Sequence, residues 1–153
     1  NSPCAILHSS LSNHVTAHRF LYDRVSLTLP ATPDDTLPTN ERILRFTQQE
    51  SPALAALYYN YGRYLLISST RPGSLPPNLQ GLWANGVSTP WNGDYHTNIN
   101  LQMNYWPAFV TAIPETFAAY IDFAKAYRDA AEISADGAPY PFGRGKCAYL
   151  LWR

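Results

Sequence analysis

A regular apolar pattern between Ser51 and Ser69 is the feature that most restricts how this 153-residue chain folds. Ser51 and Pro52 form a typical helix start, because a hydroxyl can cap the first turn and the missing N–H of proline costs nothing at the first helical position. After this start, apolar residues recur at steps of three and four, at Leu54, Leu57, Tyr58, Tyr61 and Leu65. This spacing predicts an amphipathic helix that ends near Ser69.

Three other segments also show a helical period. They are residues 41–49, residues 99–110 and a stretch from about residue 114 to a stop before residue 137. Pro107 must kink the second segment or mark the start of its regular part. Further upstream, residues 14–29 begin with helical spacing and end in an alternation of apolar residues, Val25, Leu27 and Leu29, which predicts a short strand or an extended linker.

Proline and glycine separate these helices. Residues 30–40 are rich in turn-forming residues, and Thr39 or Asn40 can cap the short helix that follows. The apolar residues of that helix are expected to face inward; they are Ile43, Leu44 and, as a further candidate, Phe46. Residues 71–97 carry four prolines and four glycines without a sustained period, which predicts a long loop. Long loops in compact domains are usually functional.

The charge balance and the composition exclude several kinds of partner. Eleven basic residues balance eleven acidic ones, so no basic field would attract nucleic acid or anionic lipid. No stretch approaches the roughly 18 apolar residues of a membrane span, and the first residues show no signal-peptide pattern. Cys4 and Cys147 have neither the close spacing of a zinc site nor the density of a disulfide scaffold.

No cofactor or metal is expected either. The four histidines do not form a ligand set with nearby carboxylates or thiols; they are His8, His14, His18 and His96. The oligomeric state does not follow from the sequence.

Five amide side chains are concentrated in the stretch NGDYHTNINLQMNYWP, residues 92–107, among aromatic residues. They are Asn92, Asn98, Asn100, Gln102 and Asn104. Each amide offers hydrogen-bond donors and an acceptor, and aromatic rings cover apolar C–H faces. This combination suits a neutral ligand rich in hydroxyl groups, such as a sugar.

Asn98 and Asn100 would share a face only on an extended backbone, because on a helix they would diverge by about 200°. If they act together, residues 97–100 must be a non-helical approach to the next helix. Two amide oxygens could then hold a water aimed at a reacting carbon, with a carboxylate as the base. Alternatively, Thr97 or Asn98 caps the helix and the other amides satisfy buried backbone groups.

Structural roles are also open for the other residues of this region. His96 can be a hydrogen-bonded structural histidine. The aromatic residues can simply pack in the core or the loop, and a sugar platform needs at least one of them to be exposed. They are Trp83, Trp91, Tyr95 and Trp106.

The segment YGRYLLISSTRPGSLPPNLQGLWANGVSTPWNGDYHTNINLQMNYWPA, Tyr61–Ala108, strongly resembles the inverting α-L-fucosidases of glycoside hydrolase family 95. Upstream, YDRVSLTL and LPTNERILRF resemble the part of that family that joins a β-sandwich to a helical barrel. The resemblance covers roughly residues 17–135 and implies an all-α fold, part of an (α/α)6 barrel with about four helices. The implied domain boundaries are 1–29 for the linker from an upstream β-sandwich domain, 30–145 for the N-terminal part of the catalytic barrel, and 146–153 for an atypical tail.

The resemblance also implies a mechanism. In that family a glutamic acid protonates the leaving oxygen, while two asparagines, helped by an aspartate, position the water that attacks the anomeric carbon. The asparagine pair matches Asn98 and Asn100, which favours catalysis over capping. The substrate-binding candidates that accompany the pair are His96, Trp91, Gln80 and Tyr95. The implied substrate is a fucosylated oligosaccharide or glycan, so the full-length parent is expected to be secreted, extracellular or periplasmic.

The chain departs from the family pattern in several places. The acid and the supporting aspartate of the family come from segments further downstream, and neither Glu115 nor Glu132 matches the acid. Phe109 stands where the family commonly has an acidic residue, and residues 146–153 no longer follow the family.

These departures lead to an expectation about the whole chain. About four helices cannot close a ring of six hairpins, so an apolar face would be left open. A truncated fragment that is inactive alone is therefore expected, since inversion needs an acid on the far side of the sugar. The alternatives are a non-catalytic carbohydrate-binding protein derived from this fold and a helical interaction module unrelated to sugars.

Overall fold

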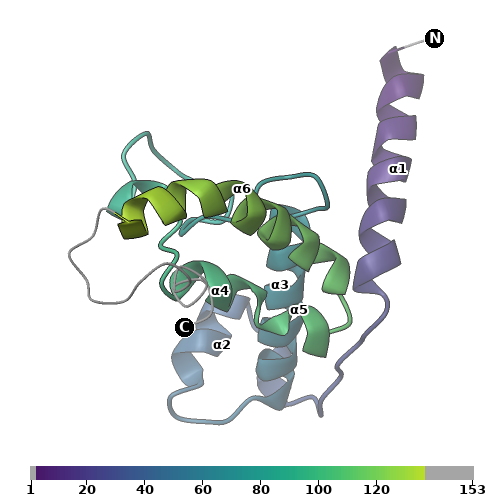
Figure 1. Cartoon of the computed structure of the whole chain (residues 1–153). Coiled ribbons are helices and arrows are strands. Elements are labelled where there is room, and N and C mark those ends of the chain that lie inside the picture. The colour runs from purple at the N-terminus through teal and green to yellow at the C-terminus, as the bar shows by residue number, and fades with distance from the viewer. Residues whose placement is uncertain (1–2, 137–153) are drawn as a thin grey trace. The chain divides into compact units, whose positions relative to one another are not determined.

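The computed structural model describes residues 3–136, with side chains from residue 7 to residue 132. Cys147 and the predicted atypical tail at 146–153 lie outside the described residues. Within them every regular element is a helix, and an isolated bridge between Asn78 and Gly81 is the only β-pairing (Figure 1). The prediction of an all-α chain is therefore confirmed. The chain divides into two compact units, one up to Leu65 and one from Leu66 onward.

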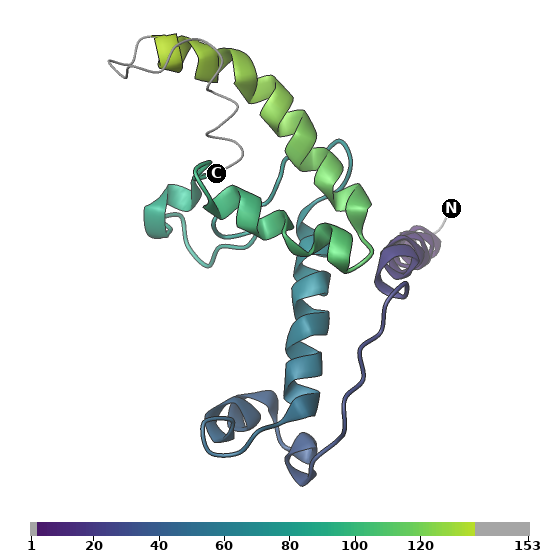
Figure 2. The same cartoon turned by 60° about the horizontal axis from the view of Figure 1, so that its bottom comes forward.

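The first unit contains α1, the 3-10 turn η1, α2 and most of α3. Their bounds are Pro3–Tyr22, Pro33–Thr36, Thr39–Arg45 and Pro52–Ser69. Helix α1 begins well before residue 14, where the apolar spacing first indicated a helix. Residues 23–32 follow α1 as a non-helical trace (Figure 2). In this trace half-buried Val25, Leu27 and Leu29 alternate with exposed residues, which fits the extended linker rather than a strand.

The C-terminal end of α1 is capped by Arg63, a residue of α3 that is only 1% exposed. The last carbonyls of a helix have no partner within the helix. The Arg63 guanidinium donates hydrogen bonds to the carbonyl oxygens of Leu21, Tyr22 and Val25, at 3.1, 2.8 and 2.9 Å. It also lies over the Tyr22 ring, 5.3 Å from the ring centroid. A buried cation thus neutralises the negative end of a helix dipole.

The sequence predictions for α2 are wrong in two respects. Pro38 is the N-cap, so the helix begins at Thr39, and no side chain caps it; Thr39 and Asn40 are therefore not caps. The residues expected to face inward are exposed: Ile43, Leu44 and Phe46 by 57%, 73% and 48%. Within the described residues no other element covers this apolar face.

Ion pairs hold α2 to the preceding turn instead. The Asp35 carboxylate binds Arg42 and accepts a 2.7 Å hydrogen bond from the backbone N–H of Thr32. Asp34 pairs with Arg45 at 3.1 Å. Because the Asp35–Arg42 pair is largely shielded from solvent, it contributes more to α2 placement than an exposed pair would.

Helix α3 begins as its sequence predicts. The Ser51 hydroxyl oxygen accepts a hydrogen bond from the backbone N–H of Leu54 at 3.2 Å, so the cap is confirmed. The buried residues of this helix include Ala56, Arg63 and Ile67, whereas several of the apolar residues that predicted the helix are exposed; these are Leu57, Tyr58 and Tyr61. Helix α3 therefore carries apolar side chains on more than one face.

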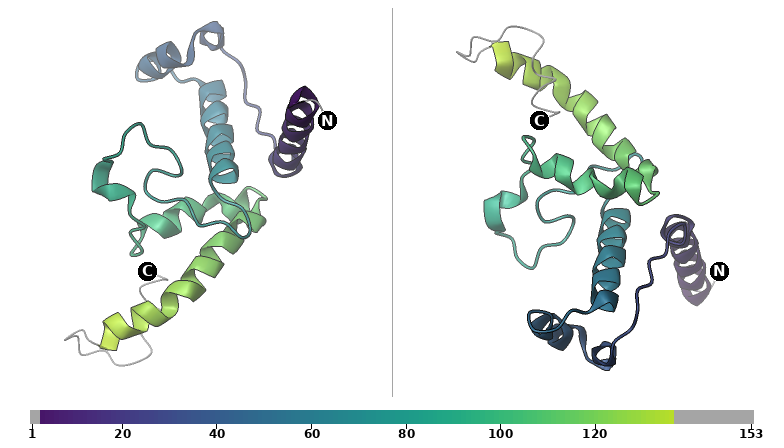
Figure 3. Two further views of the ribbon diagram at one scale, coloured as in Figure 1. Left: turned by 90° about the horizontal axis from the view of Figure 1, so that it is seen from above. Right: turned by 90° about the horizontal axis from the view of Figure 1, so that it is seen from below.

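The second unit contains a long loop with a 3-10 turn, followed by helices. The elements are η2 (Pro90–Gly93), α4 (Asn100–Tyr105), α5 (Pro107–Val110), η3 (Pro114–Thr116) and α6 (Phe117–Asp136). Pro107 separates α4 from α5 because it has no N–H for the next helical bond, and the Trp106 N–H bonds to the Met103 carbonyl at 3.3 Å. Figure 3 shows α5 leading through a short connection into α6. Helix α6 runs to Asp136, the last described residue, so the predicted stop before residue 137 stays a prediction.

The core of the second unit forms around Tyr105. Leu101, Tyr105 and Ala108 are at most 2% exposed and follow helical spacing across the break at Pro107. The Tyr105 ring meets those of Phe117 and Tyr120, with centroids 5.7 and 5.4 Å away. The apolar residues on which the helix prediction rested lie on the other face, where Met103, Trp106 and Val110 are exposed.

Candidate functional site

The residues before α4 form a turn, not the extended backbone on which Asn98 and Asn100 would share a face. Residues 97–99 form a turn, and Asn100 is the first residue of the helix. The N-cap is Ile99, whose φ of −157° and ψ of −37° together are neither helical nor extended, and no side chain caps the helix. The alternative prediction, that Thr97 or Asn98 is the cap, is therefore wrong. The predicted non-helical approach is present.

The amides of this segment divide into two groups. Gln102 donates from Nε2 to the Thr97 carbonyl at 2.6 Å, and Asn104 donates from Nδ2 to the Pro77 carbonyl at 3.1 Å. These two amides satisfy backbone groups, as the structural alternative expected. Asn98 and Asn100 are both exposed, and neither side chain bonds to another residue in the described part of the chain. Their donors and acceptors are open to water or a ligand.

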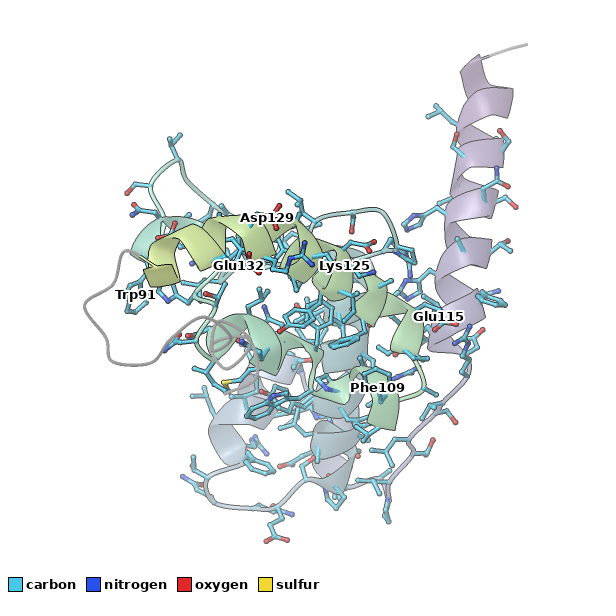
Figure 4. All side chains as sticks on the ribbon, viewed as in Figure 1. Trp91, Phe109, Glu115, Lys125, Asp129 and Glu132 are labelled. Carbon is cyan, nitrogen blue, oxygen red and sulfur yellow. The ribbon has the colours of Figure 1, made fainter. Side chains whose placement is uncertain are left out.

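Trp91 is displayed by an unusual turn. Its φ is 51°, that of Asn92 is 55° and that of Gly93 is 63°, and a positive φ is uncommon for residues other than glycine. Backbone N–H groups of Asn92 and Asp94 close the turn onto the carbonyls of Thr89 and Trp91, each at 3.1 Å. The Trp91 side chain is 72% exposed on this loop (Figure 4). Strain of this kind is found most often at functional sites.

Gln80 links two arms of the same loop. Its side-chain Nε2 donates to the Pro90 carbonyl at 3.1 Å, and its backbone N–H donates to Asn78 Oδ1 at 2.7 Å. The nearby backbone N–H of Leu79 donates to the Asp94 carbonyl at 3.2 Å. The loop predicted from prolines and glycines is therefore held together by its own hydrogen bonds, and Gln80 has a fixed orientation.

Tyr95 and His96 lie just before the asparagine pair. The Tyr95 ring packs against Phe123 of α6, with centroids 4.8 Å apart, and partial burial raises the pKa of its hydroxyl. His96 is half-buried, and its backbone carbonyl accepts a hydrogen bond from Leu101 at 3.2 Å. Tyr95 thus takes the packing role that was an alternative for it.

The two glutamates that do not match the family acid, Glu115 and Glu132, differ in exposure. Glu132 is 62% exposed and lies 3.8 Å from Arg128 one turn away, in the charged row shown with Lys125 and Asp129 in Figure 4. Glu115 is half-buried in η3. Within residues 3–136, no three His, Cys, Asp or Glu side chains gather as a metal site, and no helix is long and apolar enough to cross a membrane.

Sequence spacing alone could not show which tryptophans are exposed. Three of them are, with Trp83, Trp91 and Trp106 at 48%, 72% and 62%. Trp83 also borders a hollow in the loop that the sequence analysis did not identify. The only sequence signal for this hollow is the neighbourhood of amide, hydroxyl and glycine residues around a tryptophan, a pattern that ordinary loops share.

Comparison with known proteins gives consistent matches. The family model described as the glycosyl hydrolase family 95 catalytic domain matches residues 7–144. "Probable alpha-fucosidase A" of Aspergillus niger is 48% identical over 106 residues, which are 68% of this chain and 13% of that protein. "Alpha-L-fucosidase 2" of Arabidopsis thaliana is 41% identical over 120 residues, 75% of this chain and 14% of that protein.

A further relative, "Probable alpha-fucosidase A" of Aspergillus oryzae, is 40% identical over 118 residues, 74% of this chain. The chain spans between 13% and 16% of the length of these curated relatives.

Proposed function

Because the chain belongs to the family of glycosyl hydrolase family 95 catalytic domains, we propose that it is part of a domain that hydrolyses α-L-fucosidic bonds with inversion. The observation that carries this proposal is the pair of exposed amides, Asn98 and Asn100, at the non-helical start of α4. The substrate is a fucosylated oligosaccharide or glycan, in keeping with relatives that are named as α-fucosidases. A secreted, extracellular or periplasmic location follows from such substrates.

The asparagines position the attacking water. Their side-chain oxygens accept its hydrogen bonds and aim an oxygen lone pair at the anomeric carbon of fucose. A new C–O bond forms on one face of the sugar as the glycosidic C–O bond breaks on the other. An amide cannot take the proton that the water loses, so a carboxylate must accept it. A carboxylic acid on the opposite face protonates the leaving oxygen.

The neighbouring residues hold the sugar in this scheme. The exposed Trp91 ring covers an apolar face of fucose. His96 and the hydroxyl of Tyr95 flank the asparagines in sequence and offer polar contacts. Gln80, whose amide nitrogen is used by Pro90, presents its Oε1 as an acceptor. The general acid and the supporting aspartate are supplied by segments outside this chain.

The test is a chimera in which the matching segment of the Aspergillus niger relative is replaced by that of this chain. Asn98→Ala and Asn100→Ala should each lower kcat on an aryl α-L-fucoside much more than they raise KM. The loss belongs mainly to the transition state and should cost about 3–5 kcal/mol. Product binding should change much less.

Asn104→Ala is the matched control, since it removes an amide that only supports the Pro77 carbonyl. It should lower the thermal midpoint while kcat stays within about threefold of the parent, because one lost hydrogen bond costs roughly 1 kcal/mol of stability. Near-normal kcat in both asparagine variants would contradict the catalytic assignment. A chimera that binds fucose without hydrolysis would favour the non-catalytic carbohydrate-binding alternative.

A further inference from the structure

Two Asn-Gly pairs lie in the loop between α3 and α4, Asn85-Gly86 and Asn92-Gly93, and the sequence has no others. An asparagine that precedes glycine can react with its own backbone, because glycine has no Cβ to shield the attacking nitrogen. Asparagine is one of the thermally labile residues for this reason. Whether a given pair reacts depends on the backbone around it, and the two pairs differ in this respect.

The reaction needs only water as a co-reactant. The backbone nitrogen of glycine bonds to Cγ of asparagine, the bond between Cγ and Nδ2 breaks, and the glycine N–H proton leaves with the amide group as ammonia. The product is a cyclic imide. Water then adds to one of the two imide carbonyl carbons, the C–N bond to that carbon breaks, and the nitrogen takes up a proton. Opening at Cγ gives aspartate, whereas opening at the backbone carbonyl gives isoaspartate, whose main chain runs through the former side chain.

The pair Asn85-Gly86 lies in an open part of the loop, where residues 82–88 are all exposed. In the described part of the chain neither Asn85 nor Gly86 makes a hydrogen bond, through its backbone or its side chain. Apart from its chain neighbours, the nearest heavy atom to a Cβ built on Gly86 is the Ser88 carbonyl oxygen, at 3.9 Å. The side chain of Asn85 and the backbone of Gly86 can therefore turn toward each other without breaking an interaction.

The pair Asn92-Gly93 is held in the turn that displays Trp91. The φ and ψ of Asn92 are 55° and 14°. At this ψ the Gly93 nitrogen nearly eclipses the backbone nitrogen of Asn92 and points away from its Cβ, so the imide ring cannot close. A rotation that closed the ring would break the 3.1 Å hydrogen bond from the Asp94 N–H to the Trp91 carbonyl. A Cβ on Gly93 would lie 3.4 Å from Thr89 Oγ1, so the peptide also has little room to turn.

We propose that Asn85 is a site of spontaneous deamidation, where the chain converts its own asparagine to aspartate and isoaspartate, and that the turn around Asn92 protects the second pair. The reaction places a carboxylate in residues 72–93, which contain no charged side chain. Isoaspartate also adds a methylene group to the main chain of the loop. Molecules of different age therefore differ in charge and in backbone length at this position. The modification is independent of the proposed function, because no sugar takes part in it.

The test incubates the chimera in a mildly alkaline buffer, once folded and once in enough urea to unfold it. Peptide mass spectrometry follows the loss of the amide at both pairs, and electron-transfer fragmentation separates aspartate from isoaspartate. In the folded chimera Asn85 should react at least about tenfold faster than Asn92, because the turn around Asn92 must first lose a hydrogen bond. In urea this protection is lost, and the two rates should become similar.

Gly86→Ala tests the attacking nitrogen without disturbing the fold. Gly86 does not have a positive φ and has room for a Cβ, so alanine should leave the thermal midpoint unchanged. Its methyl group shields the nitrogen, and the rate at Asn85 should fall toward that at Asn92. Ser88→Ala changes another exposed residue of the loop and should deamidate like the parent. Equal rates at Asn85 and Asn92 in the folded chimera, or a ratio of rates that urea does not change, overturn the proposal. Deamidation of Gly86→Ala at the rate of the parent also overturns it.

Discussion

The amide groups of Asn98 and Gln102 are chemically alike, but the local backbone gives them different surroundings. Gln102 is inside α4, where its side chain reaches back to the Thr97 carbonyl. Asn98 precedes the helix in a turn and remains exposed. Composition alone therefore cannot tell an exposed amide from one that satisfies the backbone. The position of each amide relative to the start of α4 makes the distinction.

A single buried hydroxyl should give the fold an alkaline limit. Burial raises the pKa of Tyr105 to about 12, although its hydrogen bond to Thr70 opposes this shift. Because the folded pKa lies above the unfolded value of about 10, the folded state holds a proton that the unfolded chain loses. The stability from neutral Tyr105 is complete below about pH 10 and is lost as pH rises toward 12.

The Tyr105→Phe chimera should lose part of this alkaline decline in unfolding free energy, measured by urea titrations from pH 8 to 12. At pH 8 it should be less stable by about 1 kcal/mol, since Thr70 loses its partner. Tyr58→Phe, at an exposed position, serves as the control and should follow the parent. A Tyr105→Phe curve parallel to that of the parent over the whole range would contradict the assignment.

Arg63 stabilises the C-terminal end of α1 and has no proposed part in the reaction. Arg63→Met keeps most of the side-chain volume but removes three hydrogen bonds to the end of α1. The chimera should be destabilised by about 3 kcal/mol, and amide exchange at the C-terminal end of α1 should accelerate. Arg128→Met, which changes a 68% exposed arginine, should alter stability by less than about 0.5 kcal/mol. Equal effects of the two changes would contradict the capping role.

For the helices, the sequence predicts where each one begins and ends better than it predicts which face is buried. The start of α3 at Ser51-Pro52 and the break at Pro107 both follow from local chemistry. Which face of a helix is buried does not follow from local chemistry. In α4 and α5 the periodic residues Met103 and Val110 are exposed, whereas Leu101 and Tyr105 form the core.

The reason is that both faces of these helices are apolar, and periodicity cannot rank two apolar faces. In α2 the reason is different: the helix has one apolar face, with Ile43 and Leu44, and no other described element covers it. In the candidate site, the non-helical approach to Asn100 followed from spacing, but the hollow beside Trp83 depends on contacts between distant parts of the loop. Such contacts leave no periodic signal in a single sequence.

The cap of α3 can be tested as an element by itself. Ser51→Ala removes the acceptor for the Leu54 N–H and a weaker 3.4 Å contact to Asp35. The unfolding free energy of the chimera should fall by about 1 kcal/mol. Ser51→Asp should largely restore the cap, although its charge lies near Asp35, and Ser26→Ala at an exposed position should have no effect. A Ser51→Ala variant as stable as the parent would show that the cap contributes nothing.

For the whole molecule, membership of the family offers an explanation for the exposed apolar faces of the helices. The chain covers between 13% and 16% of its curated relatives, and helices that are apolar all round are normally buried. We expect the remaining part of a family 95 catalytic domain to cover the second faces of α3, α4 and α5. The isolated 153-residue chain should then be prone to aggregation and should not hydrolyse an aryl α-L-fucoside.

A lysine substitution at Val110, made both in the isolated chain and in the chimera, tests whether the rest of the domain covers this face. Val110 is 83% exposed, so in the isolated chain Val110→Lys should change stability by less than about 0.5 kcal/mol and should raise solubility. In the chimera the same lysine would be buried without a partner, and it should cost about 3 kcal/mol or more. Asp129→Lys adds a lysine to the charged row of α6, where the side chain is 79% exposed, and it should be tolerated in both contexts. If Val110→Lys is equally harmless in the chimera, this face remains in water in the assembled domain, and the apolar residues Met103, Trp106 and Val110 need an explanation other than the rest of the barrel.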